Sequence, residues 1–246
     1  RRPPRRGARN QSGVGRDSQF PCEVSAAAPP DSAEAMRGYY AARAAYYDAV
    51  YERPERAADI AFLREHLPSR LAGRDLLEVA CGTGYWSQHL VTRTRRLVLT
   101  DAVAEPLAIA ATRPGVTREQ CHAADAYALP ASLGAFDGLF AGLWFSHVPR
   151  ARRAEFFASI HARLVPGARV LLIDNNEAQR RDFPDEELDA AGDTYQLRVL
   201  RDGSTHRVLK NFPSQDELRA EVRAVGGTVT DYRDLDNFWL LEYELP

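Results

Sequence analysis

The sequence predicts an α/β domain built around a mostly parallel sheet. Short segments rich in Leu, Val and Ile alternate with longer segments whose apolar residues follow helical spacing. One strand-like segment, residues 76–80, runs directly into the glycine turn Cys81-Gly82-Thr83-Gly84. The chain has 246 residues, of which 45% are apolar, so it can bury a full core without covalent crosslinks.

The elements expected along the first two thirds of the chain follow a regular strand–helix order. Asp31 and Glu34 have the spacing of a capping box and predict a helix start, and Pro54 suits the first turn of a second helix. These N-terminal helices are expected within residues 31–67. The strands expected next are 76–80, 97–101, 116–122, 136–145 and 169–173, and the intervening helices are 85–90, 105–111 and 150–164.

The last third of the chain has a different pattern. Asp202-Gly203 lies between two strand-like segments and predicts an inserted β-hairpin at about residues 193–210, after the fifth strand. Ser214 with Glu217 predicts another capped helix, which runs to about residue 225. Residues 228–235 and 238–245 then read as two antiparallel strands.

Residues 1–30 are expected to be a disordered leader that precedes a single domain over residues 31–246. Residues 1–16 contain six Arg, no acidic residue and only one large apolar residue, Val14. A basic arm for nucleic acid or a membrane surface is the alternative. Without these six Arg, 26 basic residues face 34 acidic ones, a net charge of −8 for residues 17–246.

Composition excludes several classes of function. The whole chain has 32 basic and 34 acidic side chains, whereas nucleic-acid binders carry a basic excess. Its apolar runs are too short for a membrane span, and no apolar segment of a secretory signal follows the basic start. Three scattered cysteines, Cys22, Cys81 and Cys121, fit neither a disulfide framework nor a zinc site. We therefore expect a cytoplasmic protein with no metal, no nucleic-acid partner and no membrane partner, as a monomer or homodimer.

Polar residues follow several of the expected strands. In an open parallel sheet, ligands bind beyond the carboxyl ends of the strands, so Glu78 with Gly82 and Gly84, then Asp101, then Asp125 should line one crevice. A dinucleotide fingerprint needs a third glycine where this chain has Ser87, and the Lys of a phosphate-binding Walker loop is absent.

The same residues favour a ligand that lacks phosphate. Glu78 would repel a pyrophosphate and suits an ammonium group. Asp101 can accept two hydrogen bonds from a ribose diol, and Asp125 can accept one from an adenine amine. These features together describe S-adenosylmethionine. The simpler alternatives are turn glycines at Gly82 and Gly84 and helix caps at Asp101 and Asp125.

Four motifs in order resemble the class I S-adenosylmethionine-dependent methyltransferases of the small-molecule type. They are residues 77–85 (LEVACGTGY), Thr100-Asp101, residues 124–130 (ADAYALP) and residues 136–148, and the resemblance covers roughly residues 36–246. It implies a Rossmann-like, doubly wound, seven-stranded sheet, mostly parallel with one antiparallel strand, and helices on both faces. It also implies S-adenosyl-L-methionine as cofactor. The cofactor contacts it implies are Glu78, Gly82, Gly84, Asp101, Asp125, Ala126, Ala141 and, from the N-terminal helix, Tyr39.

The expected reaction is an in-line transfer of the methyl group to a small-molecule acceptor. His147 follows the fourth strand and, with an ordinary pKa near 6.5, is the candidate catalytic base. The segment 141–145 has neither the Pro-Pro of nucleic-acid amino methyltransferases nor the two Glu of protein arginine methyltransferases. Trp144 and Phe145 suggest an aromatic-lined acceptor pocket, to which Asp174, Tyr195 and His206 are weaker candidates.

Two other functions stay open at this point. A catalytically silent partner subunit would bind the cofactor without an acceptor. A nucleotide-binding oxidoreductase is disfavoured by Ser87 at the position of the third glycine.

Overall fold

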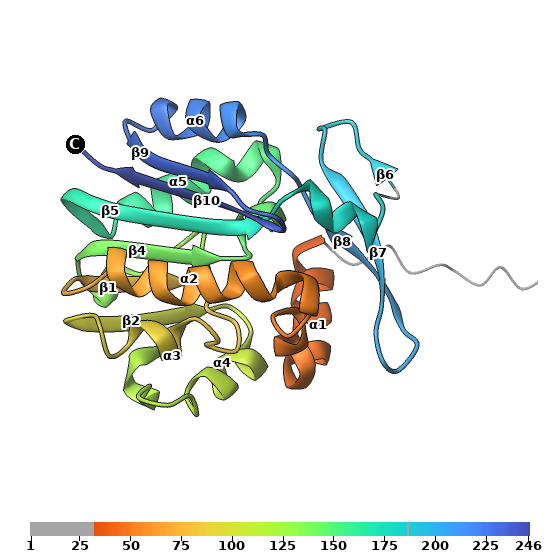
Figure 1. Cartoon of the computed structure of the whole chain (residues 1–246), viewed down its shortest axis with the longest axis horizontal. Coiled ribbons are helices and arrows are strands. Elements are labelled where there is room, and N and C mark those ends of the chain that lie inside the picture. Colours follow the sequence, from red (N-terminus) through yellow and green to blue (C-terminus); the bar gives the residue numbers. More distant parts are fainter. Residues whose placement is uncertain (1–31, 186) are drawn as a thin grey trace, which may run out of the picture. The chain divides into compact units, whose positions relative to one another are not determined.

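The computed structural model describes residues 32–185 and 187–246, so the expected leader over residues 1–30 and Asp31 of the first capping box lie outside the described residues. The described part is organised around a seven-stranded sheet with the order β3-β2-β1-β4-β5-β10-β9 (Figure 1). The strands are β1 (Asp75–Val79), β2 (Arg96–Asp101), β3 (Cys121–Ala123), β4 (Phe136–Gly142), β5 (Leu164–Asn175), β9 (Thr228–Asp234) and β10 (Phe238–Glu244). Neighbouring strands from β3 to β5 pair in parallel, whereas β10 is antiparallel to both β5 and β9. This confirms the predicted fold class, including the single antiparallel strand.

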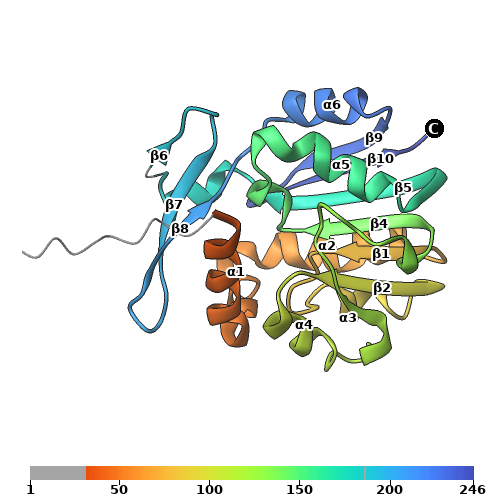
Figure 2. The same cartoon turned by 180° about the vertical axis from the view of Figure 1, so that it is seen from behind.

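Helices cover both faces of this sheet (Figures 1 and 2). On one face α2 (Ala57–Arg70) and α3 (Ser87–Leu90) contribute to an apolar cluster that contains Leu63 and Leu67. On the other face α5 (Arg153–His161) contributes Phe156 and Phe157 to a second cluster, and α6 (Gln215–Ala224) contributes Leu218 and Val222. A further helix, α4 (Ala104–Ala110), contacts β2 and β3. None of the helices in the described part of the chain is long and apolar enough to cross a membrane.

Two additions to the sheet lie beyond the carboxyl ends of its parallel strands (Figure 1). The first is the N-terminal segment, in which α1 (Ser32–Arg43) leads into the 3-10 helices η1 (Ala44–Val50) and η2 (Pro54–Arg56). The second is a small antiparallel sheet of β6 (Glu187–Leu188), β7 (Thr194–Val199) and β8 (Thr205–Leu209). The predicted hairpin is therefore present, and β6 extends it. Helix α1 packs against β8, where Tyr39, Leu200 and Val208 form a small apolar cluster.

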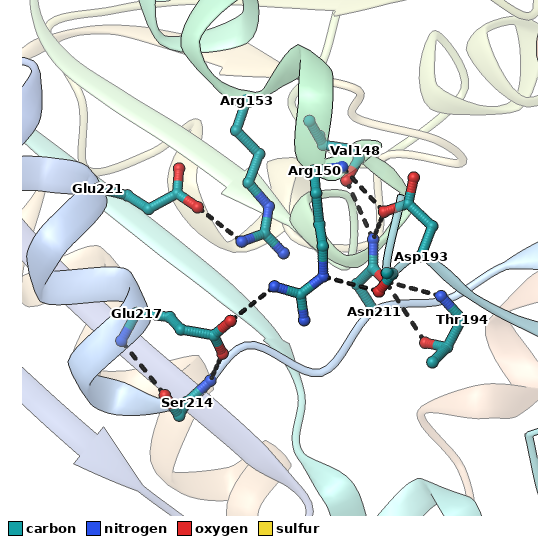
Figure 3. A network of polar contacts seen from close by, with 10 residues as sticks. Val148, Arg150, Arg153, Asp193, Thr194, Asn211, Ser214, Glu217 and Glu221 are labelled. Atoms are coloured by element: carbon teal, nitrogen blue, oxygen red, sulfur yellow. Dashed lines mark hydrogen bonds and ion pairs between the residues drawn. The ribbon is translucent and has the colours of Figure 1, made fainter. Parts of the chain in front are cut away.

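A polar network fixes the small sheet to the main domain (Figure 3). The 3-10 helix η6 (Arg150–Arg152) begins with Arg150, whose backbone N–H donates to Asp193 and whose guanidinium donates to Glu217 of α6, at 2.9 and 2.6 Å. Asn211, just after β8, donates from its side chain to Asp193 and to the carbonyl of Val148, at 2.8 and 3.3 Å. Both ends of the β7–β8 hairpin are thereby held against the segment that follows β4.

Several element boundaries differ from the sequence-based expectation. Helix α2 continues through Pro68 to Arg70, because a proline near the end of a helix removes only one hydrogen bond of the last turns. The expected strand at 116–122 is reduced to β3, preceded by the 3-10 helix η3 (Arg118–Gln120). The chain leaves β4 at Gly142; of the residues 143–145 that were expected to extend the strand, Leu143 lies in a bend and Phe145 begins η5 (Phe145–His147). The remaining short 3-10 helices are η4 (Ala131–Leu133) and η7 (Glu177–Arg181).

Candidate functional site

The carboxyl ends of β1 to β4 open into a cavity of about 280 Å³, called here the larger cavity. Helix α1, η1 and the end of β8 complete its walls. The sequence-predicted site residues that line it are Gly82, Asp101, Asp125, Ala126 and His147. Within residues 32–185 and 187–246, no group of three or more His, Cys, Asp or Glu side chains is placed to hold a metal ion.

The two glycines of the first turn serve different purposes. Gly82 has a φ of +55°, and no atom lies within 4 Å of the position that a Cβ would take, so its backbone faces open space at the cavity wall. Gly84 has a φ of +70°, and a Cβ there would lie 2.9 Å from the Cα of Ala110 at the end of α4. Gly84 does not line the cavity, and the bare backbone there allows α4 to approach.

Asp101 presents a nearly buried carboxylate to the larger cavity, with 9% of its surface exposed. Its Oδ2 accepts the backbone N–H of Gly82, and its Oδ1 accepts that of Val103, both at 2.8 Å. Burial raises the pKa of Asp101 above its ordinary value, against the opposing effect of these backbone donors. Each carboxylate oxygen can accept a second hydrogen bond, so two hydroxyl donors would fit this site.

Asp125 and Ala126 lie across the same cavity, after β3. Asp125 is exposed, and its Oδ1 accepts the backbone N–H of Tyr127 at 2.9 Å, which leaves Oδ2 without a partner among the described residues and available to a ligand donor. Ala126 is buried and also lines the cavity. The structure thus brings Gly82, Asp101, Asp125 and Ala126 to the lining of one cavity.

Three other predicted contacts lie outside the larger cavity. Glu78 is buried and accepts a hydrogen bond from the Ser87 hydroxyl at 2.7 Å, and burial raises its pKa to about 8. Ser87 stands where a dinucleotide fold would have its third glycine. Ala141 is buried within β4 and lines neither cavity, whereas Tyr39 lines a second, smaller cavity.

His147 stands where the two cavities adjoin. Its Nδ1 lies 2.6 Å from the carbonyl oxygen of Leu209, and its Nε2 lies 2.7 Å from the hydroxyl of Tyr40. Burial, with the nearby charge of Lys210, lowers the pKa of His147 from 6.5 to about 3. The ordinary pKa assumed from the sequence therefore does not apply in the folded chain, because the imidazole is enclosed and lies close to a cation.

The smaller cavity has a volume of about 140 Å³ and shares four lining residues with the larger one. The shared residues are Tyr40, Tyr47, Leu143 and His147. Leu143 has a φ of +58°, an unusual backbone for a residue other than glycine, at the point where the chain leaves β4. Asp174, Tyr195 and His206 line neither cavity; Asp174 instead binds Lys210, which does line the smaller one.

Sequence reasoning missed the basic side chains of the smaller cavity, which include Arg56, Arg198 and Lys210. Arginine is so frequent in this chain that single positions carry no signal. Lys210 is the only lysine, and its singularity was the one available clue. Tyr40 and Tyr47 lie close in sequence to Tyr39, the N-terminal tyrosine that the resemblance implied, and they line both cavities.

The N-terminal segment contacts the glycine turn and forms part of the wall of the larger cavity. Asp48 of η1 accepts a hydrogen bond from the Thr83 hydroxyl at 2.6 Å and pairs with Arg113. Tyr51 stacks on Tyr85, with ring centroids 3.7 Å apart. Tyr40 and Tyr47 are thereby held over the strand ends.

Comparison with known proteins agrees with this geometry. A family model described as a methyltransferase domain matches residues 76–167. Among solved structures, the "DhpI-SAM-HEP complex" has a TM-score of 0.72 at 27% identity over 89% of this chain and 100% of that chain. The "DhpI-SAH complex structure" has a TM-score of 0.71 at 27% identity, over 87% of this chain and 98% of that one.

A more distant structure shares the fold. The glycopeptide N-methyltransferase MtfA complexed with sinefungin has a TM-score of 0.55 at 18% identity, over 74% of this chain and 92% of that one. A search of curated proteins found no match. The matched residues, the strand order and the two structures that align over nearly their whole length show that residues 76–167 form a methyltransferase domain with the class I S-adenosylmethionine-dependent fold.

Proposed function

We propose that this chain transfers the methyl group of S-adenosylmethionine to a small-molecule acceptor, with the cofactor in the larger cavity and the acceptor in the smaller one. The observation that carries the proposal is that the two cavities share Tyr40, Tyr47, Leu143 and His147. Ligands in the two cavities would meet at this junction. The volume of about 140 Å³ suits a small acceptor rather than a macromolecular segment.

The residues of the larger cavity fit a nucleoside without phosphate. The Asp101 oxygens have capacity for the two ribose hydroxyls, and the open space at Gly82 lets a ligand approach the backbone. Asp125 and Ala126 lie where the adenine would be held. Glu78 joins β1 to the start of α3 through Ser87 and lies outside the larger cavity, so its proposed role toward the ammonium group would be indirect.

When bound, the cofactor supplies an electrophilic sulfonium methyl group, so the protein's main task is alignment. Tyr40 and Tyr47 of the N-terminal segment, together with Leu143, line the junction at which the two ligands would be aligned. Correct orientation of two reactants can lower the activation barrier by roughly 7–11 kcal/mol. We propose His147 as the group that receives a proton from the acceptor.

Calorimetric titration with S-adenosylhomocysteine tests the cofactor site. Asp101→Ala should weaken binding about 10- to 100-fold, because hydrogen bonds to a charged group contribute roughly 1.5–3 kcal/mol each. The matched control is Asp216→Ala, which removes an exposed carboxylate from the first turn of α6 and should bind like the wild type. Equal affinity of the Asp101 and Asp216 variants would refute the assignment.

Methyl transfer itself is tested with labelled S-adenosylmethionine and a fractionated pool of small metabolites. The expected result is label in at least one small-molecule fraction with the wild type and strongly reduced label with Asp101→Ala. Tight binding of S-adenosylhomocysteine without transfer to any fraction would instead indicate a catalytically silent partner subunit.

A further inference from the structure

Basic and aromatic side chains line the smaller cavity together with aliphatic and amide ones, and none of the described residues that line it is acidic. Four of its basic residues, Arg43, Arg56, Arg198 and Lys210, are called here the cationic pocket. Arg56, Arg198 and Lys210 are nearly buried, with 3%, 8% and 2% of their surface exposed. The four residues come from α1, η2, β7 and the segment just after β8, so chain segments distant in sequence converge on one small space.

Three of these four cations have no carboxylate partner within the described part of the chain. Lys210 is neutralised by Asp174, at 2.9 Å, and also donates to the Ser146 hydroxyl at 2.6 Å. The three arginines bind only neutral oxygens: Arg43 binds the Tyr39 hydroxyl, Arg56 the carbonyl of Val50 and Arg198 the side-chain amide of Gln196.

Each arginine also keeps an unused buried donor. The Nε atoms of Arg43, Arg56 and Arg198 are enclosed and have no hydrogen-bond acceptor among the described residues. Burial lowers the pKa of both Arg56 and Arg198 below the ordinary arginine value. Buried charges in proteins are normally paired, and a site that leaves two nearly buried arginines and the partly buried Arg43 without a carboxylate is arranged for an anionic ligand.

The position of the pocket indicates which ligand this is. It adjoins the larger cavity at the junction that also contains Tyr40 and His147, so a molecule held here has one end beside the cofactor site. The hydroxyl of Tyr39 and the guanidinium groups around it offer donors, and the centroid of the Phe183 ring lies 3.6 Å from the Arg198 guanidinium carbon. This lining favours a small molecule that carries an oxyanion.

We propose that the cationic pocket binds an oxyanion group, carboxylate or phosphoryl, of the methyl acceptor. The inference rests on the proposed function, because it takes the smaller cavity as the acceptor site. It specifies the acceptor as an anionic small molecule that Arg56, Arg198 and Arg43 hold by charge-assisted hydrogen bonds.

The binding test uses protein saturated with S-adenosylhomocysteine and titrated with acetate, inorganic phosphate or neutral acetamide. We expect acetate, phosphate or both to bind and acetamide not to bind, and the preferred ion distinguishes a carboxylate from a phosphoryl group. Arg56→Gln and Arg198→Gln should each weaken the anion at least 10-fold. Arg223→Gln, an exposed position on α6, is the matched control and should leave binding unchanged.

Two further readouts separate a binding role from a structural one. Without ligand, Arg56→Gln and Arg198→Gln should melt at or above the temperature of the wild type, since each removes an unpaired buried charge. Arg198→Lys, which keeps the charge, should retain part of the anion affinity. In the transfer assay, labelled product should appear in the fraction of the metabolite pool retained by an anion exchanger.

Specific outcomes overturn the inference. Failure of both anions to bind, while S-adenosylhomocysteine still binds, removes the anionic acceptor and leaves the proposed function standing. Loss of S-adenosylhomocysteine affinity in Arg56→Gln and Arg198→Gln would assign the pocket to the cofactor's own carboxylate and also overturn it. Failure of the wild type to bind S-adenosylhomocysteine would instead refute the proposed function.

Discussion

His147 is held as a neutral imidazole with one ring nitrogen free to accept. A carbonyl oxygen only accepts hydrogen bonds, so the 2.6 Å contact with Leu209 places the proton on Nδ1. Nε2 is then an acceptor, and the Tyr40 hydroxyl donates to it at 2.7 Å. With a pKa lowered to about 3, the ring stays neutral throughout the physiological range. Any proton that reaches Nε2 must pass by way of the Tyr40 hydroxyl or displace it.

This arrangement predicts that His147 and Tyr40 act as one unit. His147→Ala and Tyr40→Phe should each lower kcat, by about 10²-fold at most, since general base catalysis contributes 10²–10⁴-fold and a base of low pKa falls at the low end. The double variant should be no slower than the slower single variant, while the Kd for S-adenosylhomocysteine changes less than twofold. Multiplying effects in the double variant would show that the two side chains act independently.

The turn after β1 contains two glycines with different roles: Gly84 allows close packing, and Gly82 borders the larger cavity. An alanine at a left-handed backbone position costs about 1–2 kcal/mol, which applies to both Gly82→Ala and Gly84→Ala. At Gly84 the new Cβ would also lie 2.9 Å from the backbone of Ala110, and such overpacking adds about 1–3 kcal/mol. Urea unfolding should therefore show the greater loss for Gly84→Ala.

The binding measurement should give the opposite order. The Cβ of Gly82→Ala enters open space at the wall of the larger cavity and should weaken S-adenosylhomocysteine more than Gly84→Ala does, once both are compared below their melting temperatures. A stable Gly84→Ala variant with the weaker cofactor binding would reverse the assignment of the two positions.

The elements that the sequence predicted well are those set by local chemistry. The capping box of Ser214 and Glu217 opens α6 where expected, with both reciprocal hydrogen bonds formed. The glycine turn, Asp101 and Asp125 could be placed at one crevice because parallel strands end at the same edge. The end of β4 at Gly142 was missed, because the apolar residues of 143–145 continue the strand pattern while the backbone turns away at Leu143.

The residues that line the smaller cavity could not be predicted from local sequence patterns, because packing between distant segments of the molecule brings them together. Arg198 is far from Arg43 and Arg56 in the sequence, and the docking of α1 on β8 helps to bring them to one cavity. The network around Arg150, Asp193 and Asn211 holds the β7–β8 hairpin against the main domain (Figure 3). A chain whose residues 17–246 carry a net charge of −8 thus keeps unpaired positive charges in one interior cavity.

The buried Glu78 makes the stability of the whole domain depend on pH in a defined direction. Its pKa is about 8 in the folded chain and 4.5 ordinarily, so unfolding releases a proton between these values. Rising pH therefore favours unfolding, and the stabilising effect of the protonated carboxyl, complete below pH 4.5, is lost as pH rises through about 8.

His147 acts in the opposite sense: its pKa is about 3 when folded and 6.5 ordinarily, so its contribution to stability is lost as pH falls from 6.5 toward 3.

Glu78→Gln isolates the first of these effects, because the amide oxygen can still accept the Ser87 hydroxyl but has no proton to lose. We expect the melting temperature of the wild type to fall relative to this variant as pH is raised from 5 to 9. Glu105→Gln, at an exposed position in the first turn of α4, is the control, and its melting curve should follow that of the wild type across the range. If the Glu78→Gln curve also runs parallel to the wild type, the carboxyl is ionised in the folded state, and the floor of the cofactor site carries a permanent negative charge.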